Sequence, residues 1–117
     1  AKGAEREARE QGFITTLLGR RCRVFHYPGG GDDARKMFNR RIQGSAADMI
    51  KKSMLDAWRA GYRLRMTVHD ENVFSVSGEK EARECAEIMT AAVSLHVPVL
   101  SDLAIGKTWG DMKEIVL

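Results

Sequence analysis

Two short apolar, β-prone runs, Leu64–Val68 and Val73–Val76, flank a brief polar segment. Runs of this kind separated by a few turn-forming residues predict a β-hairpin. Its tip carries His69, Asp70 and Glu71. Neighbouring carboxylates repel each other unless solvent or a cation compensates, and Mg²⁺ prefers carboxylate oxygens. The tip is therefore either a solvated polar turn or part of a metal site.

The longest helical pattern covers residues 34–60, where apolar side chains recur at spacings of three and four. A second line, Arg35, Asn39 and Gln43, shares one face because the helix repeats every 3.6 residues. This face is either solvated or contacts a duplex, since Arg binds phosphates and the amides both donate and accept. The predicted buried stripe comprises Phe38, Ile42, Ala46, Met49, Ile50, Ser53, Met54 and Ala57.

The N-terminal part of the chain predicts a helix followed by a hairpin. Residues 1–11 are rich in Ala, Glu and Arg but have almost no apolar face, which is typical of the exposed end of a helix. Residues 13–25 predict a short hairpin with a basic turn. Its arginines, Arg20, Arg21 and Arg23, are either a solvated rim or phosphate contacts.

A glycine-rich loop, residues 27–33, precedes the long helix. It lacks both the Gly-Lys-Ser/Thr and the G-x-G-x-x-G patterns of phosphate-binding loops, so a connector is the preferred interpretation. Asp32 or Asp33 is expected to cap the helix that follows.

The C-terminal part predicts a helix over 79–95, a strand over 99–105, and a tail containing Trp109 that folds back onto the domain. Helices and strands in this order predict an α+β fold, a small antiparallel sheet with helices packed on one face. At 117 residues the chain is expected to form a single domain, residues 1–117.

The composition is that of a folded protein: 44% hydrophobic and 30% charged, with no low-complexity tract. A net charge of +3 is compatible with a phosphate-rich partner. The two cysteines form no C-x-x-C pair, which argues against a zinc site and for a reducing compartment. The most apolar stretch, residues 86–100, is too short to span a bilayer. We therefore expect no membrane partner and a cytoplasmic location.

Five segments, in order, resemble the C-terminal palm portion of a family A DNA polymerase of the bacterial DNA polymerase I type. They are T-L-L-G-R-R at 16–21, R-x-x-x-N-x-x-x-Q-G-S-A-A-D at 35–48, V-H-D-E-x-V-F at 68–74, L-x-V-P at 95–98 and G-x-x-W at 106–109.

The resemblance implies a role for each matching position. Asp70 and Glu71 would bind catalytic Mg²⁺ in a two-metal site, with Asp70 the more important, and His69 would lie near the primer terminus. The positions that would touch the duplex, largely from the minor groove, are Arg35, Asn39 and Gln43. The implied partners are a primer–template duplex and a deoxynucleoside triphosphate.

Some expected parts of the family are not found. These are the aspartate of a D-Y-S-Q-I-E motif and the R-x-x-x-K…Y-G fingers helix. Arg41 and Asn72 stand where the family customarily has Pro and an apolar residue. The hypothesis is therefore that the chain is one part of a split or fragmented polymerase and is inactive without a second chain that carries the missing motifs. If a phage encodes the chain, the expected location is the host cytoplasm. The alternatives are a non-catalytic nucleic-acid-binding module and a structural subunit.

Overall fold

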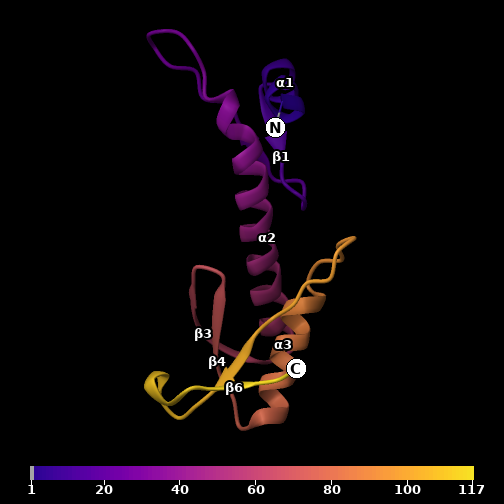
Figure 1. Cartoon of the computed structure of the whole chain (residues 1–117), viewed down its shortest axis with the longest axis vertical. Helices are drawn as coiled ribbons and strands as arrows, with labels where there is room; N and C mark the ends of the chain where they lie inside the picture. The colour runs from indigo at the N-terminus through magenta and orange to yellow at the C-terminus, as the bar shows by residue number, and fades with distance from the viewer. Residues whose placement is uncertain (1) are drawn as a thin grey trace. The chain divides into compact units, whose positions relative to one another are not determined.

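The computed structural model describes residues 2–117 and has the α+β class expected from the sequence (Figure 1). The chain is built from two compact units, Ala1–Asp48 and Met49–Leu117. The helices are α1 (Lys2–Gln11), α2 (Met37–Arg59) and α3 (Glu79–Ala91), with 3-10 turns η1 (Ala34–Lys36) and η2 (Trp109–Asp111). The strands are β1 (Phe13–Thr15), β2 (Arg21–Arg23), β3 (Arg63–Val68), β4 (Glu71–Ser75), β5 (Leu103–Ile105) and β6 (Lys113–Ile115).

The strands pair as three antiparallel ladders, β1–β2, β3–β4 and β5–β6. The sequence predicted one small antiparallel sheet, whereas these strands form three separate two-stranded sheets. The predicted strand over 99–105 is confined to β5, and its partner β6 lies in the segment expected to be a tail. The alternating pattern that marks a half-buried strand is too short in β6 to be recognised.

In the first unit, a small core forms where α1, the β1–β2 hairpin and the start of α2 meet. Helix α1 ends at Gly12, whose φ of +76° lies in the left-handed region. Two of its alanines, Ala4 and Ala8, are buried. The two alanines lie four residues apart and so share one face of the helix. Two small side chains do not form a recognisable apolar pattern in the sequence, which is why this helix was predicted to be exposed although it is buried on one side. The core consists of Ala8, Ile14, Val24, Ala34 and Met37.

The stripe predicted for the long helix is correct only in its second half. Ser53 and Ala57 are buried as expected, whereas Phe38 and Ile42 are 42% and 53% exposed. At the start of α2 it is Met37 that enters the core. An apolar stripe is buried only where another element covers it, and its sequence does not say where that cover ends.

In the second unit, α2 ends at Arg59, and Gly61 closes it, as predicted. The glycine has a φ of +89°, and the amide of Tyr62 donates to the carbonyl of Ala57 over 3.0 Å. This is the usual hydrogen bonding at the end of a helix that closes with a left-handed glycine. Helix α3 buries Ala82 and Cys85, also as predicted.

Candidate functional site

The predicted hairpin is present as β3 and β4, joined by a two-residue loop, His69 and Asp70. His69 has a φ of +54°, a left-handed conformation in which His is found more often than most residues. Glu71 is the first residue of β4 and pairs with Val68. The side chains of His69, Asp70 and Glu71 are all exposed. The turn therefore presents the imidazole and both carboxylates to solvent.

The base of this tip is attached to α2 through Asn72. Its side-chain amide donates to the hydroxyl of Ser53 over 3.1 Å, and Ser53 donates to the carbonyl of Ile50 over 2.8 Å. Successive side chains of a strand point to opposite faces. Glu71 therefore lies on the face of β4 away from Ser53, which leaves its carboxylate open to solvent.

Asp70 and Glu71 supply the hard oxygen donors that Mg²⁺ prefers. Among the ion pairs of residues 2–117, none involves either carboxylate. The two residues therefore fit part of a magnesium ligand set. Within the same residues, no group of three or more His, Cys, Asp or Glu side chains is placed to hold an ion.

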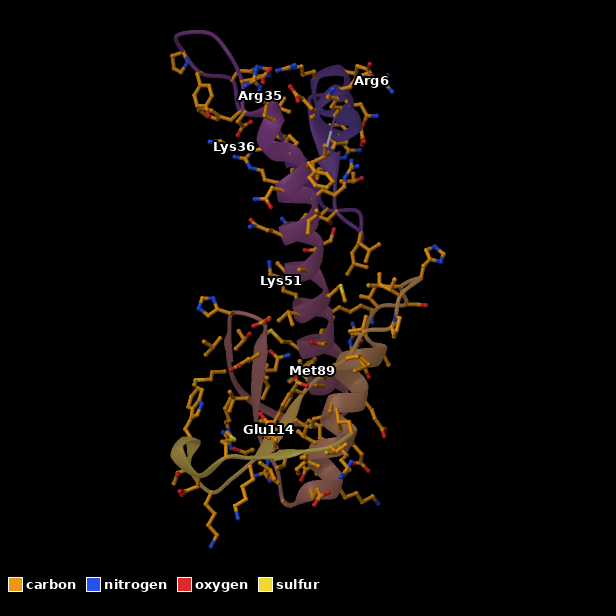
Figure 2. All side chains as sticks on the ribbon, viewed as in Figure 1. Arg6, Arg35, Lys36, Lys51, Met89 and Glu114 are labelled. Atoms are coloured by element: carbon orange, nitrogen blue, oxygen red, sulfur yellow. The ribbon has the colours of Figure 1, made fainter. Side chains whose placement is uncertain are left out.

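The second candidate surface lies on the first unit, at the start of α2. Arg35 belongs to the 3-10 turn η1, and Figure 2 shows it with Lys36 at the N-terminal end of the long helix. Asn39 and Gln43 follow one helical turn apart, and both side chains are exposed. In the described part of the chain neither amide has a hydrogen-bond partner, so both remain available to a ligand.

The loop before η1 is held by its two aspartates. Asp32 accepts a hydrogen bond from the amide of Ala34 over 3.0 Å, whereas the N-cap residue of η1 is Asp33, whose side chain makes no capping hydrogen bond. The hydrogen bond from Ala34 and the neighbouring Arg9 lower the pKa of Asp32. Asp33 accepts from the amide of Phe25 over 2.7 Å and pairs with Arg40 at 2.6 Å. The glycine-rich loop is thus a connector anchored at its base.

The two arginines of the basic turn have different surroundings. Arg21 is exposed, and its guanidinium carbon lies 4.7 Å from the centre of the Phe13 ring. The Nε of Arg20 donates to the carboxylate of Asp48 over 2.8 Å, a bond that raises the pKa of Arg20. DNA contact by these two residues stays a prediction.

Ion pairs of the first unit join residues that no pattern in the sequence connects. Asp48 is buried and also accepts a hydrogen bond from Thr16. Arg41 bonds Glu7 over 2.6 Å and the carbonyl of Thr15 over 3.2 Å. One signal in the sequence could have indicated the Asp48 contact, namely the glycine at position 44. A glycine inside a helix lowers the stability of the helix, so its presence often means that another segment packs closely there.

Comparison with known proteins decides the family. The model of DNA polymerase family A matches residues 1–111. The chain belongs to DNA polymerase family A. This family A chain is 45% identical over 111 residues to a DNA-directed DNA polymerase of Pseudomonas phage M6, covering 94% of this chain and 17% of the relative. It is 39% identical over 123 residues to DNA polymerase I of Bacillus caldotenax, covering 92% and 14%.

A solved structure agrees with the sequence comparison. The POL domain of Pol1 from M. smegmatis, in complex with DNA primer–template and dNTP, matches with a TM-score of 0.68 and 32% identity, over 83% of this family A chain and 20% of that one. The chain therefore spans a small part of the length of the polymerases it resembles. In residues 2–117, none of its helices has both the length and the apolar character that a bilayer crossing requires.

Proposed function

We propose that this chain is the C-terminal palm segment of a DNA-directed DNA polymerase. The observation that carries the proposal is the β3–β4 tip, where Asp70 and Glu71 are exposed and in no ion pair of the described residues, within a segment that matches the family. The reaction would be attack of a primer hydroxyl on the α-phosphate of a deoxynucleoside triphosphate, with release of pyrophosphate. In reactions of this type, bound Mg²⁺ stabilises the negative charge on the attacking and leaving oxygens.

The residues of the tip would have distinct tasks. Asp70 and Glu71 would hold the metal, with Asp70 contributing the principal carboxylate, and His69 would lie near the primer terminus. One further aspartate and the helix that grips the incoming nucleotide would come from the remainder of the polymerase. The active enzyme would thus contain this segment and a second one, either as separate chains or as parts of one chain.

Duplex contacts would come from the first unit. Asn39 and Gln43 carry both donors and acceptors, and the minor groove presents nearly the same acceptors at every base pair. Contacts of this kind sense correct pairing without reading the sequence. Arg35 and Arg21 would bind phosphates beside them, as their exposure permits.

Primer extension tests the catalytic assignment. The chain is mixed with a family A polymerase truncated before its matching segment, and extension of a labelled primer is measured with Mg²⁺. Asp70→Ala is expected to lower the rate by roughly 10³-fold, because it removes a principal metal ligand. Asp102→Ala, which removes another exposed carboxylate of the same unit, is the matched control. An Asp70→Ala chain as active as the control would remove Asp70 from the chemistry.

A non-catalytic DNA-binding module is the second candidate, and the distribution of charge favours it. The unit Ala1–Asp48 has ten Lys and Arg residues against six Asp and Glu, whereas Met49–Leu117 has nine against ten. The duplex-facing candidates therefore lie in the basic unit. Salt-dependent duplex binding that survives Asp70→Ala, with no extension in any mixture, would support this function.

A further inference from the structure

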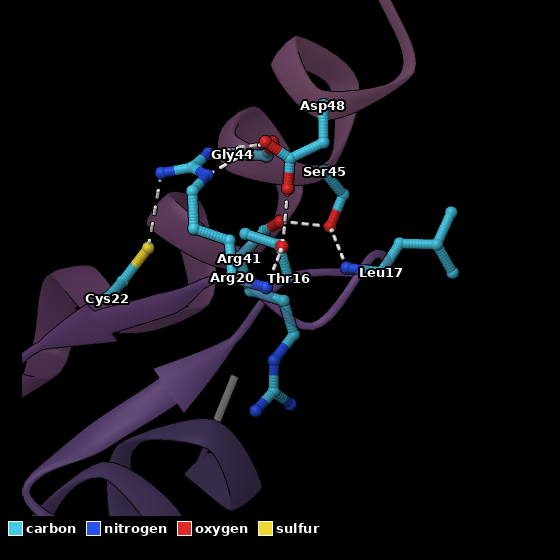
Figure 3. Close-up of polar contacts among 8 residues, drawn as sticks. All are labelled: Thr16, Leu17, Arg20, Cys22, Arg41, Gly44, Ser45 and Asp48. Carbon is cyan, nitrogen blue, oxygen red and sulfur yellow. Dashed lines mark hydrogen bonds and ion pairs between the residues drawn. The ribbon is translucent and has the colours of Figure 1, made fainter. Parts of the chain in front are cut away.

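The loop between β1 and β2 is bound to α2 by a set of contacts that we call the turn–helix network (Figure 3). Its members are Thr16, Leu17, Arg20, Gly44, Ser45 and Asp48. The amide of Leu17 donates to the hydroxyl of Ser45 over 2.9 Å, and that hydroxyl donates to the carbonyl of Arg41 over 2.6 Å. Loop and helix are thus joined through backbone as well as side chains.

Arg20 remains 47% exposed, yet its guanidinium is engaged by neighbouring groups of the protein. Its Nε donates to Asp48 over 2.8 Å, its Nη2 donates to the carbonyl of Gly44 over 3.1 Å, and its Nη1 lies 4.0 Å from the sulfur of Cys22. The Asp48 side chain is 8% exposed. Bidentate contact with a phosphate uses two parallel N–H donors of the guanidinium, its donor fork. In this chain two of the nitrogens, Nε and Nη2, already donate to a buried carboxylate and a helix carbonyl.

Gly44 leaves room for the side chains of the loop against α2. A Cβ at this position would lie 2.9 Å from the Cγ2 of Thr16 and 3.2 Å from the Nη2 of Arg20. A glycine inside a helix costs about 1 kcal/mol relative to alanine. The position therefore gives up helix stability to let the loop lie directly against α2.

The network occupies the helical turn that follows Gln43. Its contacts on α2 run from Gly44 to Asp48, immediately after the second exposed amide. A helix segment fixed by several hydrogen bonds from a neighbouring loop has little freedom to rotate or fray. The side chains of Asn39 and Gln43 are consequently presented from a rigid surface, which lowers the entropy lost when they bind.

We infer that Arg20 is a positioning residue: with Asp48 it holds the turn of α2 that presents Gln43 to the duplex, and it does not bind phosphate itself. This inference rests on the proposed function, because it assigns Gln43 to the duplex. It is an alternative to the sequence-based prediction that Arg20 contacts DNA.

The first test is Asp48→Asn, because the two roles of Arg20 predict opposite signs. If Arg20 bound phosphate, removing the competing carboxylate would strengthen duplex binding. As a positioning residue, it should lose its orientation, and the affinity should fall about fivefold, the equivalent of one hydrogen bond. The measurement is fluorescence anisotropy of a labelled primer–template titrated with the 117-residue chain between 50 and 200 mM salt, at temperatures where circular dichroism shows it folded.

Two further variants separate position from charge. Gly44→Ala alters no charge and favours the helix, so it carries the test even if Asp48→Asn does not fold. It should weaken binding by a similar factor and leave the dependence of log Kd on log salt unchanged. Arg20→Lys keeps the charge but lacks the fork, so it should behave like Arg20→Ala. Loss of a phosphate contact would instead lower the salt slope by about one.

A double-mutant cycle with Gln43→Ala completes the test. Positioning predicts that Gln43→Ala weakens binding in the wild-type chain but has little further effect beside Gly44→Ala. If Gln43→Ala has no effect in the wild type, or if the wild type does not bind, the proposed duplex face is wrong. If Gln43→Ala weakens binding while Gly44→Ala and Asp48→Asn do not, or if Asp48→Asn strengthens it, only the positioning role of Arg20 is wrong.

Discussion

At the scale of single residues, buried polar groups in this chain differ in how completely they are satisfied. Asp33 is buried and has both an amide donor and an arginine partner. Asn72 donates to Ser53, but its Oδ1 is buried and has no hydrogen-bond partner in the described structure. A buried acceptor without a partner costs about 1–3 kcal/mol. Asn72 is therefore a local weakness beside the candidate metal-binding tip.

Replacing this side chain is expected to stabilise the protein. Asn72→Leu should raise the free energy of unfolding by about 1 kcal/mol, since it removes the unpaired oxygen while Ser53 keeps its bond to Ile50. Urea unfolding followed by circular dichroism measures the change. Asn72→Asp, which keeps the size but buries charge, should destabilise the chain. A less stable Leu variant would show that the amide contributes more than its bond to Ser53.

At the scale of elements, a few side chains hold secondary structure together across the chain. Arg83 of α3 donates to Glu79 and to the carbonyl of Val116, which connects α3 to the C-terminal segment. Tyr62 precedes β3 and donates its hydroxyl to Glu84 of α3 over 2.8 Å. That hydrogen bond, together with burial, raises the pKa of Tyr62 to about 12.

The Tyr62 contact predicts a loss of stability in alkali. The folded pKa lies above the value of about 10 of an unfolded tyrosine, so the folded state holds the proton more tightly. Its contribution is complete below pH 10 and disappears as the pH rises towards about 12. Urea unfolding between pH 9 and pH 11.5 measures this decline, and Tyr62→Phe should flatten it. An equally steep decline in the Phe variant would assign the effect to other groups.

At the scale of the whole molecule, the positive charge and the candidate catalytic acids lie in different compact units. The unit Ala1–Asp48 is basic, and its buried acids are paired with arginines. Arg21 and Lys36 remain exposed, and neither is in an ion pair of the described residues. Free cations on a basic surface give nucleic-acid binding its dependence on salt.

Removing these two charges should reduce the salt dependence of duplex binding. In Arg21→Ala/Lys36→Ala, the slope of log K against log salt should flatten by about two, because each lost phosphate contact contributes about 0.9. Anisotropy titrations at several salt concentrations measure the slope. Lys80→Ala/Lys107→Ala removes the same charge from exposed sites of the other unit and should leave it unchanged. Equal changes in both variants would mean that net charge alone governs binding.

Much of this architecture could be predicted because the signals are local. The helix expected over 34–60 is observed as η1 and α2. The predicted hairpin is also observed, with its turn at His69 and Asp70. The exposure of Asn39 and Gln43 also agrees with a polar helix face. Burial was less predictable: the stripe through Phe38 and Ile42 is apolar in sequence but exposed in the structure, since burial depends on a covering surface.

The sequence by itself determined the helices, the central hairpin, the α+β class and the family, because periodicity, turn residues and ordered motifs are read along the chain, but it did not reveal β6. Only the tertiary structure decided which charged groups are free and which are engaged. Arg20 and Arg21 are neighbours in sequence, yet one meets a carboxylate 28 positions away and the other stays exposed. Ion pairs are short-range contacts in space, so their partners are chosen by the packing of distant segments.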